Sequence, residues 1–200
     1  METIPLVENY YARKVEKEEF DEVFKQNRAK MFNESVDFKP YAMISETERE
    51  KLRLIFQAMH FPNALHYLVE QDGQLVGWSY GFQDTKEEFY MCNSGIFKAH
   101  RRKGIYSKLL KIIMDEAIAI GYQIIHSKHA LTNNAVIIPK LKAGFMISGI
   151  SLEDKFGALV KLVYYTNKDR TAVMRFRSGE EALPKELAEY GHLIKGEIAD

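Results

Sequence analysis

The chain has 200 residues, of which 46% are hydrophobic, so it can bury a substantial core and form one domain, with or without an appendage. Its 28 Lys and Arg residues balance its 28 Asp and Glu residues, so no overall charge favours nucleic acid or an acidic membrane as a partner. The single cysteine, Cys92, excludes an internal disulfide framework and a thiolate metal site, and we expect no metal. The first residues lack a secretory signal pattern, and no apolar run approaches about 18 residues. We therefore expect a soluble, cytoplasmic protein.

Two amphipathic helices are predicted in the N-terminal part. Over residues 16–31, apolar side chains recur on one side of a helix whose other side carries Glu and Lys. Ser45 and Glu48 have the spacing of a capping box, and the helical pattern that follows them stops at Pro62.

The middle of the chain alternates between strands and helices. Two short apolar runs flank Asp72-Gly73, which indicates a hairpin, and residues 88–97 indicate a further strand. An apolar helical pattern over 104–120 ends at Gly121, where left-handed termination is easy. Residues 122–130 then indicate another strand.

A short helix capped by Thr132 or Asn133 is expected to run to Leu141, and Pro139 should kink or shorten it. Two final strands are predicted around the turn at 154–157, followed by a polar, basic tail with a short helix near its end. This order predicts an α/β (α+β) fold with a mixed, twisted central sheet and helices on both faces.

The stretch before the 104–120 helix has the features of an anion site. Arg101, Arg102 and Lys103 precede Gly104, which has no Cβ and lets an anion approach the backbone closely. The helix that follows directs its unpaired N–H groups and the positive end of its dipole to this turn. The alternative is a solvated basic turn, and no P-loop or dinucleotide pattern is present.

This stretch resembles the pyrophosphate-binding motif of the GNAT N-acetyltransferase superfamily, which reads Arg or Gln, two residues, Gly, one residue, then Gly or Ala. Arg101 and Gly104 match, whereas Tyr106 stands where the family usually has a small residue. The order of elements from about residue 15 to 166 also resembles the family layout. The resemblance implies a GNAT-like sheet of about six or seven strands, with residues 1–166 as the acetyltransferase domain and 167–200 as a C-terminal extension packed on it.

The resemblance further implies that acetyl-CoA is the co-substrate. Its pantetheine arm would pair with the end of the 88–97 strand, since splayed parallel strands expose unpaired N–H and C=O groups. Its pyrophosphate would lie on the backbone of the motif, and an asparagine of the 132–141 helix would reach the cofactor. The implied cofactor-binding residues are Ile96, Phe97, Lys98, Arg101, Arg102, Lys103, Gly104, Ile105, Tyr106, Ser107 and, in preference to Asn133, Asn134.

The position of the usual general acid departs from the family pattern. Many relatives carry a Tyr four residues before the Gly of a Gly-Phe helix stop, and counting back from Gly144 gives Lys140. A lysine on a helix surface is expected to be solvated, and it could protonate the departing thiolate only if burial or a neighbouring charge lowered its pKa. Transfer without a strong acid remains chemically open.

A base must accept a proton from the attacking amine. His126 lies in an apolar context and is expected to be a hydrogen-bonded core histidine, whereas His129 is nearer its strand end, where ligands of α/β sheets collect. Cys92 lacks a Cys-His pattern and is expected to be a small buried side chain. The candidate catalytic residues are His129, Glu88 and Tyr90.

The sequence therefore favours an N-acetyltransferase acting on an amine of a small molecule or peptide, with neither nucleic acid nor a membrane as partner. A coenzyme A-binding module without catalysis is the alternative, because the usual Tyr is missing. An RNA-binding surface around 98–103 is disfavoured by the even charge. A homodimer is left open. Aromatic residues of the N-terminal part are expected to be mostly core, with an acceptor pocket as the alternative: Phe32, Phe38, Tyr41, Phe61, His66 and Tyr67.

Overall fold

The computed structural model describes residues 3–32, 40–59 and 63–190. In chain order the elements are β1 (Thr3–Pro5), β2 (Tyr10–Lys14), α1 (Lys17–Met31), η1 (Pro40–Ala42), α2 (Glu46–Ala58), β3 (Leu65–Gln71), β4 (Gln74–Gln83), β5 (Glu88–Ile96), η2 (Lys98–His100), α3 (Ile105–Ile120), β6 (Ile124–Ala130), α4 (Asn134–Lys142), β7 (Met146–Glu153), β8 (Gly157–Tyr165), α5 (Lys168–Arg177) and η3 (Lys185–Tyr190). Among the described residues no helix is both long enough and apolar enough to cross a membrane.

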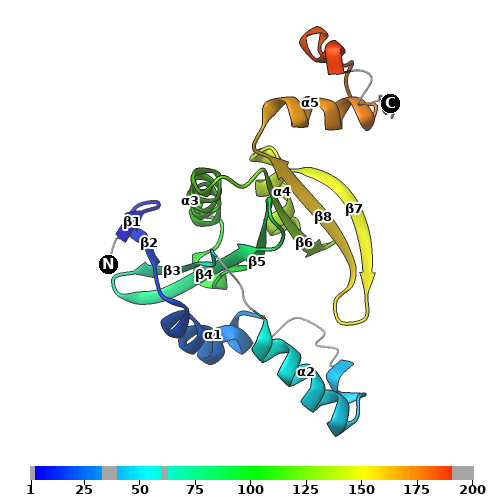
Figure 1. Ribbon diagram of the computed structural model, residues 1–200. Coiled ribbons are helices and arrows are strands. Elements are labelled where there is room, and N and C mark those ends of the chain that lie inside the picture. The colour runs from blue at the N-terminus through cyan, green and yellow to red at the C-terminus, as the bar shows by residue number, and fades with distance from the viewer. Residues whose placement is uncertain (1–2, 33–39, 60–62, 191–200) are drawn as a thin grey trace.

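The predicted α/β fold with one mixed, twisted sheet is confirmed. The strands lie in the order β1-β2-β3-β4-β5-β6-β8-β7, and neighbours are antiparallel except for the parallel pair β5 and β6. Helices α3 and α4 cover one face of the sheet and α1 lies against the other (Figure 1). The expected helices on both faces are therefore present.

The sheet has eight strands instead of the expected six or seven. The additional pair is the N-terminal hairpin of β1 and β2, which the sequence did not signal because β1 has three residues and β2 has five. Strand β2 pairs with β3 along its whole length and buries Tyr10 and Ala12 completely. Tertiary pairing, and not local periodicity, makes this segment a strand.

Two apolar cores lie on the two sides of the sheet. The larger core packs α3 on the central strands, with Leu109 and Ile113 against Phe89 and Ile125. The smaller core packs α1 on β3 and β4 around Trp78. The larger core therefore holds one face of β5 and β6 in place, through Phe89, Met91 and Ile125, close to the point where these strands separate.

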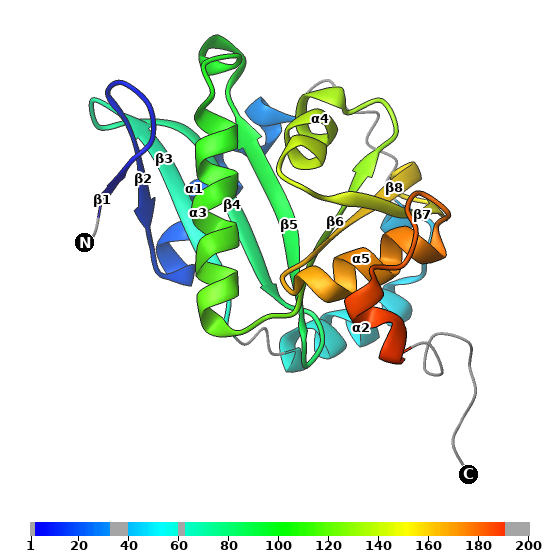
Figure 2. The same cartoon turned by 90° about the horizontal axis from the view of Figure 1, so that it is seen from above.

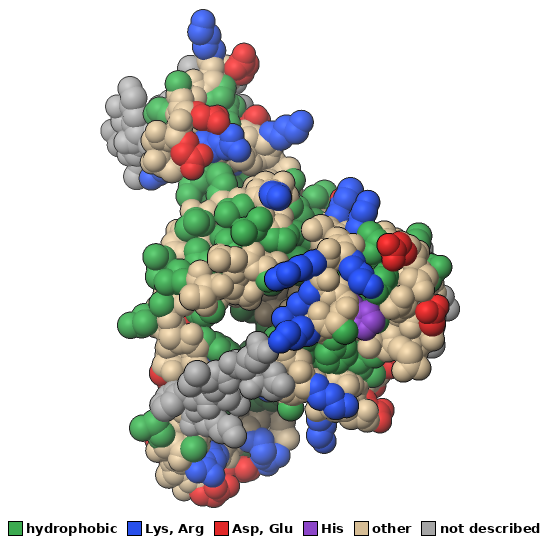
Figure 3. Space-filling model, turned by 180° about the vertical axis from the view of Figure 1, so that it is seen from behind, with side chains coloured by type: hydrophobic (Ala, Val, Ile, Leu, Met, Phe, Trp, Pro, Cys, Tyr) green, Lys and Arg blue, Asp and Glu red, His purple; other side chains and the backbone are tan. Residues whose placement is uncertain are grey.

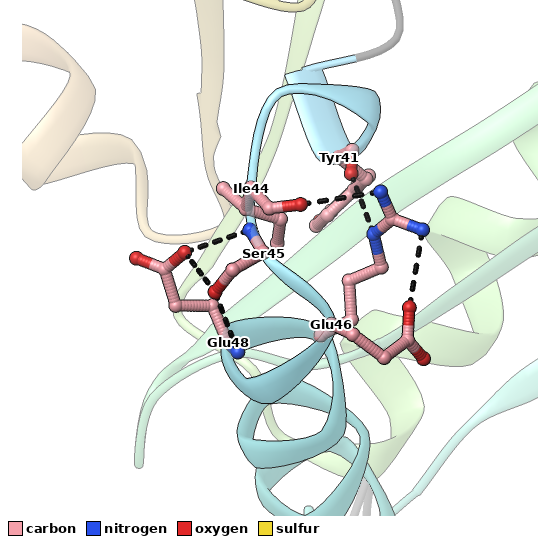
Figure 4. A network of polar contacts seen from close by, with 6 residues as sticks. Tyr41, Ile44, Ser45, Glu46 and Glu48 are labelled. Atoms are coloured by element: carbon pink, nitrogen blue, oxygen red, sulfur yellow. Dashed lines mark hydrogen bonds and ion pairs between the residues drawn. The ribbon is translucent and has the colours of Figure 1, made fainter.

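The predicted capping box at the start of α2 is present. Ser45 Oγ accepts from the Glu48 N–H at 3.3 Å, and the Ser45 N–H donates to the Glu48 carboxylate at 2.8 Å (Figure 4). The same loop is tied by the Arg49 side chain, which donates to the backbone oxygens of Tyr41 and Ile44. Pro62, the expected stop of this helix, lies outside the described residues, and α2 ends at Ala58.

The other local signals have their expected places with one exception. The β3–β4 turn has left-handed backbone at Asp72 and Gly73, and α3 ends at Gly121 with φ 109°. Helix α4, however, continues through Pro139 to Lys142. Because α4 begins at Asn134, Pro139 removes one backbone donor without ending the helix.

The C-terminal segment 167–190 follows β8 and projects beyond the sheet (Figure 1). Its helix α5 is joined to the β4–β5 turn by Arg170, whose Nη1 donates to the Glu87 carboxylate at 2.8 Å. Leu187 of η3 is buried. The division at residue 166 stays a prediction.

Candidate active site

The central feature of the site is an opening between the two parallel strands. Strands β5 and β6 pair at three positions, the last of which joins Tyr90 and His126. Beyond this pair the strands diverge, and α4 lies beside the gap (Figure 2). Strand β6 continues to pair with β8 along its other edge as far as Ala130, so the opening comes from the departure of β5.

A β-bulge in β5 accompanies this departure. One residue of β4, Gly81, opposes two residues of β5, Met91 and Cys92. A bulge bends the strand that carries it and increases its local twist. A Cβ on Gly81 would lie 2.5 Å from the backbone oxygen of Tyr90, so only glycine permits this close approach. The bulge begins one residue after the last parallel pair, which is where the opening starts.

The edge of β5 that faces the opening carries backbone groups that do not pair with another strand. The Phe97 N–H donates to Val76 of β4, so alternation along the antiparallel pair turns the N–H and C=O groups of Ile96 and Ser94 to the opening. Of these groups, the Ile96 oxygen accepts from the Arg101 side chain. Of the three arm-binding residues expected from sequence, Ile96 thus presents its N–H, whereas Phe97 is turned to β4. Ser94 is an additional edge position that strand periodicity could have revealed once the register was known.

The turn before α3 has the geometry of an anion site. Arg102 and Gly104 have left-handed backbone, with φ of 66° and 80°. The first hydrogen bond within the helix runs from the Lys108 N–H to the Gly104 oxygen, so the four preceding N–H groups have no acceptor within the helix. These groups and the positive end of the helix dipole point to the turn, which favours a phosphate there.

The basic side chains of this turn have different environments. Arg101 Nε donates to the Ile96 backbone oxygen at 2.8 Å, so this side chain closes the end of β5. Lys103 Nζ donates to the Tyr10 hydroxyl at 2.8 Å, and that hydroxyl lies 3.1 Å from His100 Nδ1. The N-terminal hairpin therefore supports the turn through Tyr10. Lys and Arg side chains gather beside a hollow on the face shown in Figure 3.

The first turn of α3 combines buried and exposed positions. Ile105 is buried in the larger core and Ser107 is exposed. Tyr106, at the position where a small residue was expected, packs against the same core. Its hydroxyl is buried without a hydrogen-bond partner among the described residues, and burial raises the pKa of Tyr106.

A cavity of about 900 Å³ lies at the opening. Its walls come from β5, β6, α4 and the β7–β8 hairpin, and they include Cys92, Ser94, His129, Asn133 and Lys140. Asn133 is the N-cap of α4 but makes no capping hydrogen bond with its side chain, whereas Asn134 is exposed. The geometry thus favours Asn133 over Asn134 as the asparagine that reaches a ligand.

Lys140 differs from the expected solvated lysine, because it is 1% exposed. Its Nζ donates to Ser127 Oγ at 2.8 Å and to Met91 Sδ at 3.3 Å, and it lies 4.8 Å from the centre of the Phe145 ring. Burial lowers the pKa of Lys140 to about 7. The expectation failed because the spacing of α4 residues does not show that this side of the helix faces the opening.

His129 lies on the same side of the sheet as Lys140. Its Nε2 is 2.9 Å from Ser127 Oγ, and burial, together with the charge of Lys140, lowers the pKa of His129 to about 3. A histidine with so low a pKa is a weak base at neutral pH.

A second cluster lies on the opposite side of β5 and β6. His126 follows the alternation of the strand and points away from Ser127. As expected it is buried and hydrogen-bonded: its Nε2–H donates to Asp84 Oδ2 at 3.0 Å, and Glu88 Oε2 lies 3.8 Å away. The Tyr90 ring stacks on its imidazole at 5.0 Å. Burial lowers the pKa of His126 and raises that of Tyr90 to about 12.

The ligand atoms of Asp84, Glu88 and His126 lie within 4.8 Å of one another, so this cluster can hold a cation or an ammonium group. Asp84 was not singled out from the sequence, where it belongs to a polar turn. Its role becomes visible only when the turn brings it beside β6, since no short-range spacing links residues 84 and 126.

The remaining residues singled out from the sequence are Cys92 and the N-terminal aromatic residues. The Cys92 thiol donates to the Tyr80 hydroxyl at 3.2 Å, and burial raises the pKa of this thiol. His66 and Tyr67 are buried and Phe32 lines the cavity, whereas Tyr41 is exposed. Phe38 and Phe61 lie outside the described residues.

Comparisons with known proteins agree with this geometry. Residues 28–145 match the model of the acetyltransferase (GNAT) family. Among curated proteins, none matches this chain by sequence. Solved structures share the fold, and three examples describe the likeness.

Ribosomal-protein-S5-alanine acetyltransferase from Vibrio fischeri is 13% identical, with a TM-score of 0.61 over 84% of this chain and 98% of that one. The protein yncA from Salmonella typhimurium, solved with its cofactor acetyl-CoA, is 16% identical, with a TM-score of 0.58 over 80% and 96%. An N-acetyltransferase from Staphylococcus aureus Mu50 is 20% identical, with a TM-score of 0.57 over 80% and 100%. Because the family model covers more than half of the residues, the chain belongs to the GNAT acetyltransferase family.

Proposed function

We propose that the protein is an acetyl-CoA-dependent N-acetyltransferase that transfers the acetyl group to an amine by direct attack. The observation that carries this proposal is the opening between β5 and β6. The turn at one end of it has the geometry of an anion site, and its two faces carry side chains of opposite charge. Lys140 lies on one face, and the carboxylates around His126 lie on the other.

The cofactor would occupy the opening. Its pyrophosphate would accept hydrogen bonds from the backbone of residues 102–106, where the glycine and the helix N-terminus favour negative charge. Its amide-bearing arm would pair with the free edge of β5 at Ser94 and Ile96. Asn133, whose side chain is not used for capping, would contact it from α4. Support comes from yncA, which has the same fold and was solved with acetyl-CoA.

The acceptor amine would approach from the face that carries Asp84 and Glu88. Two carboxylates beside the neutral imidazole of His126 attract a protonated amine and can take up the proton that it must lose before it attacks. His126 directly precedes Ser127 on β6, so its side chain points to the opposite side of the sheet from Lys140. Because His129 contacts the Lys140 side, the carboxylate face suits the base better than His129 does.

Direct attack is favoured over a covalent route through Cys92. A nucleophilic cysteine needs a lowered pKa or an adjacent base. Burial raises the pKa of Cys92, and its thiol is hydrogen-bonded to a tyrosine hydroxyl. The cavity wall around it therefore offers no activation of the thiol.

Calorimetric titration with coenzyme A, followed by a thiol-release assay with acetyl-CoA and a panel of primary amines, tests the proposal. The panel should include polyamines, amino acids and peptides with free N-termini. We expect saturable binding of coenzyme A and acetylation of at least one amine. Absence of coenzyme A binding would refute the proposal, and binding without turnover on the whole panel would favour the non-catalytic module.

The amine site has its own test. Replacing both carboxylates, Asp84→Asn with Glu88→Gln, should raise the KM for the amine about tenfold or more while leaving the KM for acetyl-CoA within about twofold. Glu87→Gln is the matched control, because Glu87 belongs to the same turn but pairs with Arg170. An equal effect of the control variant would contradict the assigned site.

A further inference from the structure

Lys140 is a buried cation whose contacts are uncharged. Its amine contacts a serine hydroxyl, a thioether sulfur and an aromatic ring, which stabilise an ammonium less than a carboxylate would. The two hydrogen-bond acceptors, Ser127 on β6 and Met91 on β5, belong to the two strands that separate. The amine thus bridges the opening at its closed end, next to the last parallel pair.

The contacts continue from Lys140 to the cavity wall. An ammonium group only donates, so Ser127 Oγ accepts from Lys140, and its own hydrogen is available to His129 Nε2 at 2.9 Å. His129 is therefore neutral, with Nε2 as the acceptor. Since His129 is partly exposed and lines the cavity, the three groups form a continuous path from the buried amine to the solvent side.

We propose that Lys140 protonates the sulfur of the departing coenzyme A, and that Ser127 and His129 carry a replacement proton from solvent to Lys140. This inference rests on the proposed acetyl transfer. It assigns to a lysine the acid role that its position would otherwise give to a tyrosine, and it gives His129 a task other than that of base.

The step balances as follows. The amine nitrogen forms a bond to the thioester carbonyl carbon, and the carbon–sulfur bond breaks with its electron pair going to sulfur. Lys140 Nζ gives a proton to that sulfur and becomes neutral, and the thiol leaves. A proton from solvent then adds to His129 Nε2, the ring nitrogen that carries no hydrogen, and gives the imidazolium. Ser127 passes its hydroxyl proton to Lys140 and receives the His129 Nε2 proton, so His129 returns to its neutral form.

The pKa values of Lys140 and His129 agree with this role. Burial lowers the pKa of Lys140 to about 7, so the amine can both give and regain a proton near neutral pH. Among the described residues, the titratable group linked to it is His129 on β6, through Ser127 and through charge, since Met91 on β5 and Phe145 before β7 are uncharged. Loss of the Lys140 charge removes one cause of the low His129 pKa, which allows His129 to accept a proton at that stage.

The first test needs no acceptor. The thiol of bound coenzyme A is titrated by the ultraviolet absorbance of its thiolate in wild type, Lys140→Met and Lys142→Met. Lys142 is exposed on the same helix and serves as the control. In the complex the thiolate and the Lys140 ammonium stabilise each other, which lowers the pKa of the thiol and raises that of the amine. We therefore expect the pKa of the bound thiol to rise by at least about one unit in Lys140→Met and to stay unchanged in the control.

The second test uses turnover with an amine found in the panel. We expect kcat of Lys140→Met to fall about 10- to 100-fold, with the KM for acetyl-CoA within about twofold. The wild-type kcat should fall as the pH rises through about 7, because the acid must be protonated, and this limb should disappear in Lys140→Met. Lys140→Tyr should recover part of kcat.

The relay is tested by His129→Ala, which should lower kcat and be rescued by added imidazole, a response that a structural defect would not show. A bound thiol unaffected by Lys140→Met would refute the role of Lys140 while leaving cofactor binding intact. Lack of rescue by imidazole would refute the relay. Failure of the unaltered protein to bind coenzyme A would instead refute the proposed function, and this inference with it.

Discussion

Replacement of the buried lysine by methionine, Lys140→Met, is expected to stabilise the folded protein at neutral and low pH. Burial lowers the pKa of the Lys140 amine from 10.5 to about 7. One pKa unit corresponds to about 1.4 kcal/mol, so burial of the charged amine destabilises the folded state by about 5 kcal/mol relative to water. Methionine keeps the unbranched apolar chain, and it loses the hydrogen bond to Ser127, which contributes about 1 kcal/mol.

The pH dependence follows from the protons bound in each state. Between about pH 7 and pH 10.5 the unfolded chain keeps a proton on Lys140 that the folded chain has released, so wild-type stability rises with pH in this window. Below about pH 7 both states are protonated and the full penalty remains. Lys140→Met should therefore be more stable than wild type by about 4 kcal/mol at about pH 6, and this advantage should shrink by about 1.4 kcal/mol per pH unit above pH 7.

The assay is urea unfolding followed by circular dichroism, at several values between about pH 6 and pH 9.5. The two proteins share every other titrating group, so the difference between them reports Lys140 together with its effect on the neighbouring His129. Lys142→Met should show no pH-dependent difference from wild type, since Lys142 is exposed. A difference between Lys140→Met and wild type that stays constant with pH would show that Lys140 keeps an ordinary pKa, and would refute its burial.

Three further substitutions test other parts of the site. Gly104→Ala should lower the free energy of unfolding by about 1–2 kcal/mol because φ is 80°, and it should weaken coenzyme A binding in calorimetry. The control is Gly179→Ala, at φ 79° outside the site, which should cost the same stability and leave binding unchanged. Gly81→Ala should lower stability by about 1–3 kcal/mol or more in thermal unfolding, whereas Gly149→Ala, with no atom within 4 Å of its Cβ, should be nearly neutral. Tyr106→Phe should stabilise the unliganded protein by about 1 kcal/mol in urea unfolding, because it removes a buried hydroxyl without a partner among the described residues, and a loss of stability would show that the hydroxyl is satisfied.

The parts of the fold that follow from local rules were predictable. The capping box at Ser45, the turn at Asp72-Gly73 and the helix stop at Gly121 each depend on residues a few positions apart. The N-terminal hairpin was not predictable, because Tyr10 and Ala12 become strand residues only through pairing with β3. Because this hairpin was missed, the expected number of strands in the sheet was too low.

The candidate site divides in the same way. The anion-binding turn is contiguous, so the order of Arg101–Lys103, Gly104 and a helix indicated it from the sequence. The residues that form the acid face and the base face are far apart in the sequence. Lys140 meets Ser127 thirteen residues away, and His126 meets Asp84 forty-two residues away, so no local spacing reveals either pair.

The sequence by itself determined the elements other than the N-terminal hairpin, and the chemistry of the cofactor turn, because caps, glycine geometry and hydrophobic periodicity act within one or two turns of chain. Only the tertiary structure decided which residues share an environment. It placed an ordinary-looking lysine of α4 between two separating strands, where the loss of water changes its protonation. Solvation depends on everything that packs around a group, and that is a property of the whole fold.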